Sequence, residues 1–246
     1  MFKLVERIES VPMIGPLIKK WYWKYIIWKT NPRPLIMGAV AGKDAVSVMV
    51  IGANDGVSTD PVFPLLKANP RWRGTFVEPV PYLFEKLKQN YGSEERFTFV
   101  NAAVSDEAKP LQFFYVSADI RREHPDYPGW VEQLGTFDKR IILESFEGRL
   151  APYLVETEVA GIKLEQLLKE TDNAALDVLV IDTEGADWKI LRQLDLDRHA
   201  PTVILFENCF LTSEERVAAM QFLRSRYKIR DLGKDYFCQL KRRSAI

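Results

Sequence analysis

Apolar and polar positions alternate along this chain in blocks that predict strands followed by helices. Short, largely apolar runs have the length and the β-branched or aromatic content of buried strands, at residues 46–51, 74–78, 97–101, 176–182 and 202–207. Between them, apolar residues at helical spacing predict helices at residues 58–68, 79–90, 163–169 and 183–194. This alternation predicts an α/β fold built on an open, mostly parallel sheet.

The C-terminal part of the chain predicts one more helix and a hairpin. A capping box, Thr212-Ser-Glu-Glu215, precedes the apolar positions of residues 217–223 and marks a helix start. Two strand-like runs, at residues 227–232 and 236–240, flank a turn that contains Gly233. The last strand should therefore run antiparallel to an otherwise mostly parallel sheet.

A long stretch without a regular period lies in the middle of the chain. Residues 117–150 are bounded by two strand-like runs, at residues 111–116 and 155–159. Irregular segments of this length inside a compact domain are usually functional or mobile. We therefore expect residues 117–150 to contribute a lid or a binding surface.

The first strand ends in a glycine turn, Gly52-Ala-Asn-Asp-Gly56. Gly52 permits a sharp turn, and Gly56 removes a side chain where a ligand would come close. A helix should follow, with Ser58 or Thr59 as its N-cap and Pro61 in its first turn. A strand, a glycine turn and a helix together present backbone N–H groups to a ligand.

Length and charge indicate one domain with a distinct N-terminal segment. The chain has 246 residues, of which 47% are hydrophobic, enough for one sizeable core. Lys plus Arg equals Asp plus Glu at 34 each, so the overall charge does not point to nucleic acid. Residues 1–43 carry a net charge of +6 and an aromatic, lysine-rich run at 17–28. We interpret them as a basic, aromatic helical extension of a domain at residues 44–246.

The location of the protein follows from its cysteines and from the extension. Cys209 and Cys238 stand in no metal-binding spacing and are too few for a disulfide framework, which favours a reducing cytoplasm. No apolar run approaches the ~18 residues that span a bilayer. Trp, Tyr and Lys in residues 1–43 also suit peripheral contact with a membrane surface. A helix packed on the domain, or a lid, remains the alternative for this segment.

Polar residues or glycines follow every predicted parallel strand, where ligands bind in open α/β sheets. Glu78 stands at the end of the second strand, 22 residues beyond Gly56. This is close to the ~20 expected for a carboxylate that accepts hydrogen bonds from ribose hydroxyls. The other strand ends contribute residues 52–56, 101–103, 182–184 and 207–208.

Four segments together resemble one family of enzymes, the FkbM-type S-adenosylmethionine-dependent methyltransferases. They are Ile51-Gly-Ala-Asn-Asp-Gly56, Glu78-Pro79, Ala102-Ala-Val-Ser105 and Ile181-Asp-Thr-Glu-Gly-Ala-Asp187. The resemblance covers residues 46–208. It implies a class I methyltransferase (Rossmann-like) fold, S-adenosylmethionine over the first two strand ends, and methyl transfer, commonly to a hydroxyl.

The resemblance also implies roles for individual residues. It assigns the ribose hydroxyls to Glu78 and includes the adjacent Pro79 in the cofactor site. It assigns the sulfonium and acceptor side to Asp182 and Glu184. Ile51 departs from the pattern, since many relatives carry an acid there, and Asp55 could replace that negative charge. The remaining assignments are the methionine and ribose part to Gly52, Ala53, Asn54 and Gly56, and the adenine to Asn101, Ala102 and Ala103.

A hydroxyl acceptor gains from a general base within hydrogen-bond reach. The candidates are Asp182, Glu184, Glu207 and His124. The three carboxylates could instead hold a Mg²⁺ that polarises the acceptor oxygen. This alternative stays open, and no metal ligand is assigned.

The leading hypothesis is an O-methyltransferase that acts on a small molecule or on a sugar or glycan. A nicotinamide-dependent oxidoreductase is disfavoured, because the turn after residue 51 lacks G-x-G-x-x-G spacing. A catalytically silent interaction module is a third reading, but it would be expected to lose Glu78 or the Gly52 turn. A nucleic-acid partner is not expected, because Asp182-Thr-Glu-Gly stands where amino-directed nucleic-acid methyltransferases carry Asn/Asp-Pro-Pro-Tyr/Phe.

Overall fold

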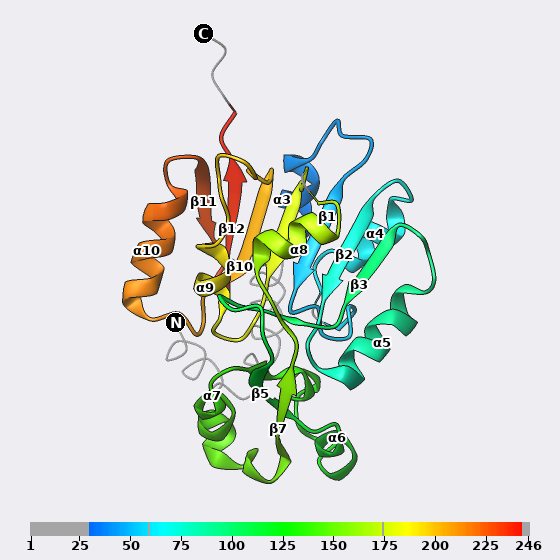
Figure 1. The fold of residues 1–246 in the computed structure, drawn as a ribbon, viewed down its shortest axis with the longest axis vertical. Helices are drawn as coiled ribbons and strands as arrows, with labels where there is room; N and C mark the ends of the chain where they lie inside the picture. Colours follow the sequence, from blue (N-terminus) through cyan, green and yellow to red (C-terminus); the bar gives the residue numbers. More distant parts are fainter. Residues whose placement is uncertain (1–29, 59, 174, 243–246) are drawn as a thin grey trace, which may run out of the picture.

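The computed structural model describes residues 30–58, 60–173 and 175–242. Within these residues, a seven-stranded sheet forms the centre of the molecule, in the order β3-β2-β1-β9-β10-β12-β11 (Figure 1). Neighbouring strands from β3 to β10 are parallel, and β12 is antiparallel to both β10 and β11. The strands are β1 (Ser47–Ile51), β2 (Arg73–Val77), β3 (Phe97–Val100), β9 (Val178–Ile181), β10 (Val203–Glu207), β11 (Tyr227–Asp231) and β12 (Asp235–Leu240). The predicted mostly parallel sheet with an antiparallel C-terminal hairpin is confirmed.

Helices cover both faces of this sheet. Successive side chains of a strand point to opposite faces, and in the central strands the side chains on both faces are apolar. Val48 and Val50 pack toward one face, and Met49 and Ile51 toward the other. The first face carries α3 (Arg33–Ala39), α4 (Phe63–Ala68) and α5 (Pro81–Tyr91). The second carries α8 (Leu164–Glu170), α9 (Asp187–Leu191) and α10 (Ser213–Leu223).

The helix α3 lies within the segment predicted as an N-terminal extension. Its Ile36 is fully buried, and it packs in the same cluster as Val48 of β1. Residues 33–40 are therefore part of the domain core. The membrane contact and helical character were predicted for residues 1–43, of which residues 1–29 lie outside the described residues.

The expected start of α4 is wrong. The helix begins at Phe63, not at Ser58 or Thr59, and its N-cap position is Val62. The side chain of Asp60 accepts a hydrogen bond from the Val62 amide at 2.6 Å and so organises the turn before the helix. Ser58 instead donates from its hydroxyl to Asp55, and Thr59 lies outside the described residues.

The predicted start of α10 is confirmed. The Glu215 amide donates to Thr212 Oγ1 at 3.2 Å, and the Thr212 amide donates to Glu215 Oε2 at 3.0 Å. Both partners of the capping box satisfy amides that the helix itself leaves without an acceptor. The local sequence alone therefore fixes where this helix begins.

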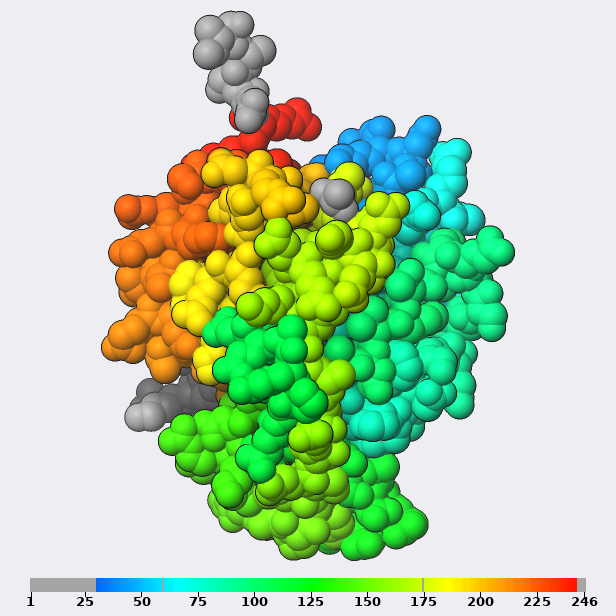
Figure 2. All heavy atoms as spheres, viewed as in Figure 1, coloured from blue at the N-terminus to red at the C-terminus, as the bar shows by residue number. Residues whose placement is uncertain are grey.

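A small lobe stands beyond the carboxyl ends of the parallel strands, and Figure 2 shows it projecting from that end of the domain. Its antiparallel sheet consists of β6 (Gly135–Thr136), β5 (Leu111–Val116) and β7 (Leu154–Val159). Short helices close it: α6 (Asp119–Glu123), η1 (Gly129–Gln133), α7 (Lys139–Glu144), η2 (Ser145–Gly148) and η3 (Ala151–Tyr153). Its own core holds Ile120, Val131 and Ile142, so the region predicted to be irregular is a packed unit.

Two very short strands tie this lobe to the main sheet. The strand β4 (Ala103–Val104) pairs in parallel with β8 (Gly161–Ile162). The two strands bracket the lobe in sequence, so their pairing brings its two connections together. Among the residues that the structure describes, no helix has the length and apolar character needed to cross a membrane.

Candidate active site

Strand register brings the polar strand ends into one row. Ile51 of β1 pairs with Val77 of β2 on one side and with Ile181 of β9 on the other. Val77 pairs with Val100, and Ile181 pairs with Phe206. The residue that follows each of these five therefore lies at the same edge of the sheet: Asn101, Glu78, Gly52, Asp182 and Glu207.

The Gly52 turn brings two strand ends into close contact. Gly52 has φ +81°, and a Cβ atom there would lie 1.8 Å from the backbone oxygen of Asp182. The amides of Gly52 and Ala53 both donate to the carbonyl of Val77, at 2.9 and 3.0 Å. Only glycine combines this positive φ with the space available. The turn therefore depends on the residue type that the sequence supplies there.

Glu78 connects the end of β2 to this turn. Its Oε2 accepts from the Asn54 amide at 2.8 Å, and its Oε1 accepts from the Val80 amide at 2.8 Å. Asn54, whose amide makes the first of these bonds, has a positive φ of +51°. A carboxylate offers about four acceptor sites, so two remain for hydroxyl donors of a ligand.

A pocket opens where the main sheet meets the small lobe. From the main sheet it is lined by predicted site residues: Gly52, Asn54, Glu78, Pro79, Ala102, Ala103, Asp182 and Glu184. From the small lobe it is lined by Phe113, Gln133, Gly135 and Phe137. The empty volume of the pocket, including the part that is open to solvent, is about 430 Å³. The small lobe therefore contributes two aromatic rings to the lining, and the main sheet contributes three carboxylates.

Four predicted cofactor residues lie beside this pocket and do not line it. Ala53 is buried in the cluster that packs against α3, α4 and α5. A Cβ atom at Gly56 would lie 2.4 Å from Leu87 Cδ1, so this glycine permits packing against α5 and does not face the pocket. Asp55 accepts from the amides of Val57 and Ser58, and Asn101 donates to the carbonyls of Glu78 and Pro79. These contacts shape the loops around the site.

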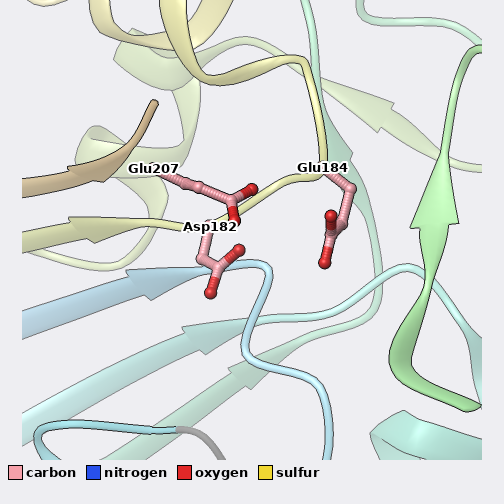
Figure 3. Close-up of side chains that lie close together, drawn as sticks. All are labelled: Asp182, Glu184 and Glu207. Carbon is pink, nitrogen blue, oxygen red and sulfur yellow. The ribbon is translucent and has the colours of Figure 1, made fainter. Parts of the chain in front are cut away.

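Three predicted catalytic carboxylates form a tight group. Asp182 directly follows β9, Glu184 lies two residues later in the loop, and Glu207 is the last residue of β10 (Figure 3). One oxygen from each lies within 4.8 Å of the others. Glu207 is 6% exposed, and its Oε2 has no hydrogen-bond partner among the described residues.

The loop that carries Glu184 is held by Asp187. Asp187 Oδ2 accepts from Thr183 Oγ1 at 3.1 Å and from the Gly185 amide at 3.3 Å. The small lobe adds a contact, because Thr136 Oγ1 donates to the carbonyl of Glu184 at 3.0 Å. Glu184 is thereby held at φ +49°, a conformation that a residue with a side chain rarely adopts.

Burial and mutual repulsion shift the protonation of this group. Burial raises the pKa of Glu207 to about 10, and the neighbouring carboxylates add to that shift. Burial and the charge of Asp182 raise the pKa of Glu184 to about 8. Burial raises the pKa of Asp182 as well, while Lys234 opposes the shift in all three. Carboxyl groups in such an environment can accept a proton near neutral pH.

Burial also raises the pKa of Glu78 to about 7, and the charge of Asp182 adds to that shift. The amides of Val80 and Asn54 oppose this shift because they stabilise the ionised carboxylate. Further hydroxyl donors from a ligand would act in the same direction. Glu78 is therefore an acceptor whose charge a bound ligand would stabilise.

His124 does not join the carboxylates in this structure. It follows α6 in the small lobe, where its ring stacks on Tyr127 at a centroid distance of 5.1 Å and meets Tyr153 at 5.8 Å. It does not line the pocket. The aromatic neighbours account for its position without a catalytic role.

The sequence analysis missed the residues that the small lobe supplies. Phe113 lies inside the strand-like run at residues 111–116, and Gln133 and Phe137 lie in the irregular stretch 117–150, which was expected to contribute a lid or a binding surface. None of the three stands at the end of a predicted parallel strand, so no pattern marked them individually. Asp187 stood in the quoted 181–187 segment, yet only its hydrogen bonds reveal that it anchors the loop.

Comparison with known proteins supports one family. The family model described as the methyltransferase FkbM domain matches residues 51–236, which include every pocket-lining residue named above. A comparison with curated protein sequences returns no significant match.

Several solved structures are similar in fold, at low identity. They include precorrin-6y C5,15-methyltransferase from Geobacter metallireducens GS-15, with 13% identity, 85% of this chain and 87% of that chain covered, and a TM-score of 0.40. The N-methyltransferase NodS from Bradyrhizobium japonicum WM9 has 8% identity, 86% and 94% coverage, and a TM-score of 0.40. Human N-acetylserotonin methyltransferase, in complex with SAM, has 9% identity, 86% and 52% coverage, and a TM-score of 0.39.

Identities and TM-scores this low carry no argument about activity. The assignment rests on the family match over most of the chain, and the glycine turn, Glu78 and the 181–187 loop lie inside the matched range. The chain belongs to the FkbM methyltransferase domain family, and it is an S-adenosylmethionine-dependent methyltransferase.

Proposed function

We propose that this methyltransferase transfers the methyl group of S-adenosylmethionine to a hydroxyl group of a small molecule or of a sugar or glycan. One observation carries the proposal: a ribose-type carboxylate, Glu78, and the acidic residues Asp182 and Glu184 line the same pocket, and β1 lies between the two strands that they follow. A hydroxyl acceptor needs a place for its proton, and this arrangement supplies carboxylates for it.

The residues present fit the cofactor. Glu78 keeps acceptor sites for the two ribose hydroxyls, and it lines the pocket together with Gly52 and Asn54 of the glycine turn. Ala102, Ala103 and Phe113 give an apolar wall suited to the adenine. When bound, the cofactor supplies an electrophilic methyl group on a positively charged sulfur, and the carboxylates of the pocket favour that charge.

The chain's own part in the reaction is alignment and proton transfer. Methyl transfer is an in-line displacement that depends on holding two reactants in line. The acceptor oxygen forms a bond to the methyl carbon, the carbon–sulfur bond breaks, and the hydroxyl proton passes to a carboxylate of the pocket. Asp182 and Glu184 are the candidates, because both line the pocket and Glu207 does not.

We also propose that the protein works in a reducing compartment. Both cysteines are free, Cys209 exposed and Cys238 buried, and the exposed thiol would be vulnerable in an oxidising one. This chemistry favours a cytoplasmic location, and the aromatic, lysine-rich run within residues 1–43 favours peripheral contact with a membrane surface.

The first test is isothermal titration of the full chain with S-adenosylmethionine, its demethylated product and NAD(H). We expect micromolar binding of the first two and none of the third. Glu78→Gln should weaken binding about tenfold or more, ~1.4 kcal/mol. Glu85→Gln, on the exposed side of α5, is the matched control and should leave binding unchanged. Intact protein that binds neither cofactor would favour a catalytically silent module.

Hydroxyl specificity is tested on the product. Purified protein, labelled S-adenosylmethionine and a panel of glycans and hydroxylated small molecules should yield labelled product that survives mild alkali, because a methyl ether is stable there. Alkali-labile label would indicate a methyl ester on a carboxylate and would contradict hydroxyl transfer.

A further inference from the structure

We propose that Asp182, Glu184 and Glu207 bind a divalent metal cation beside the methyl-transfer pocket. The three side chains come from two neighbouring strand ends and one loop, and Figure 3 shows their carboxyl groups around a common space. One oxygen from each lies within 4.8 Å of the others. Carboxylate oxygens are the ligands that Mg²⁺, Mn²⁺ and Ca²⁺ prefer.

A group of acids does not by itself indicate a metal site. Here the unpartnered oxygen of Glu207 is a second observation that points to a missing ligand. Glu207 is 6% exposed, and its Oε2 has no hydrogen-bond partner among the described residues. Buried polar atoms are nearly always satisfied, because leaving one without a partner costs several kcal/mol in an apolar environment. A cation bound to Glu207 would remove that cost.

The charge around the group also lacks compensation. Glu207 faces Asp182, Glu184 and Asp187, and it pairs across the sheet with Asp235 at the start of β12. Lys234 is the described cation that acts on all three proposed ligands. Glu207 therefore has four acidic neighbours, and one described lysine does not balance this many carboxylates.

The position of the site suggests what the cation does, and this part rests on the proposed function. Asp182 and Glu184 line the same pocket as Glu78, the expected cofactor residue. A cation held there would bind the acceptor oxygen and lower the pKa of its hydroxyl. The competing explanation for the same geometry is that protons shared among the three carboxyl groups neutralise them without a metal.

Manganese binding separates the two explanations. The full chain, freed of metals by chelation and without S-adenosylmethionine, is titrated with Mn²⁺ near neutral pH, and free Mn²⁺ is followed by electron paramagnetic resonance. We expect one bound Mn²⁺ per chain, displaced by Mg²⁺. Because the cofactor is absent, the result is independent of whether the proposed methyl transfer is correct.

Variants locate the ion. Glu207→Gln and Glu184→Gln should each weaken Mn²⁺ binding about tenfold or more, ~1.4 kcal/mol. Asp235→Asn is the matched control, because it removes a nearby negative charge outside the group of three and should weaken binding less than about threefold. Circular dichroism checks the fold, and the less buried Glu184→Gln decides the matter if Glu207→Gln does not fold.

Two results would overturn the proposal. One is that intact protein binds no Mn²⁺, which leaves shared protons as the explanation. The other is that Asp235→Asn weakens binding as much as Glu207→Gln, which would show attraction to general negative charge and no defined site.

Discussion

Gly52 and Asp182 approach so closely that a single added carbon cannot fit between them. A Cβ atom on Gly52 would lie 1.8 Å from the backbone oxygen of Asp182, and Gly52 has φ +81°. The contact joins the turn after β1 to the loop after β9. It thereby sets the positions of the cofactor side and the acidic side of the pocket relative to each other.

Replacing Gly52 should therefore be severely destabilising. Gly52→Ala combines a strained φ with a clash against backbone, which cannot rotate away, and we expect a loss of about 3 kcal/mol or more in the free energy of unfolding. Urea denaturation measures it. Gly42→Ala is the matched control, since Gly42 has φ +86° and nothing within 4 Å of an added Cβ. It should cost about 1–2 kcal/mol from strain alone. Equal losses in the two variants would contradict the close-contact argument.

Asp60 should make the folded state less stable as pH rises. Burial raises its pKa to about 6 from an ordinary 3.8, so between these values the folded chain keeps a proton that the unfolded chain has lost. The free energy of unfolding should fall by on the order of 1–3 kcal/mol across this window and then level off for this group. Urea denaturation from about pH 4 to about pH 7, with chelator present, measures the fall.

The contribution of Asp60 is isolated by difference, because Glu78 has a raised pKa as well. Asp60→Asn keeps an acceptor for the Val62 amide and removes the titration. The fall with pH should be smaller in this variant than in the natural chain. An identical pH dependence in the two proteins would show that Asp60 titrates normally.

Asp187 should act through its hydrogen bonds and not through its charge. Asp187→Ala leaves Thr183 Oγ1 and the Gly185 amide without their acceptor and should cost about 1–3 kcal/mol in the free energy of unfolding. Asp187→Asn keeps an acceptor oxygen and should recover most of that loss, because burial raises the pKa of Asp187 to about 8. If Asp187→Asn proves as unstable as Asp187→Ala, the ionised carboxylate is required instead.

The capping box of α10 should contribute a modest, local amount of stability. Thr212→Ala removes the acceptor for the Glu215 amide and should lower the free energy of unfolding by about 1 kcal/mol. Thr212→Ser retains a hydroxyl and should stay within a few tenths of a kcal/mol of the natural chain. Thermal and urea unfolding of the three proteins, measured together, test the order.

Local patterns predicted the elements whose boundaries depend on neighbours in sequence. The apolar run before Gly52, the capping box at Thr212 and the hairpin around Gly233 all occur where the sequence places them. The predicted start of α4 was wrong. The Asp60 side chain accepts a hydrogen bond from the Val62 amide, and the Ser58 hydroxyl donates to Asp55, so Ser58 does not cap the helix. Competing side-chain acceptors of this kind cannot be ranked from sequence alone.

The sequence by itself determined the family, the mostly parallel sheet and the row of strand ends from Asn101 to Glu207, because a parallel register carries polar residues after apolar strands to one edge. Tertiary structure alone decided which of those residues face the pocket. In the fold, Gly56 packs against α5 and His124 lies among aromatic rings, so neither lines the pocket. The small lobe supplies part of the pocket lining. Tertiary structure also gathered Asp182, Glu184 and Glu207, since their distances depend on how strands distant in sequence pair and how a loop is held, which no local pattern encodes.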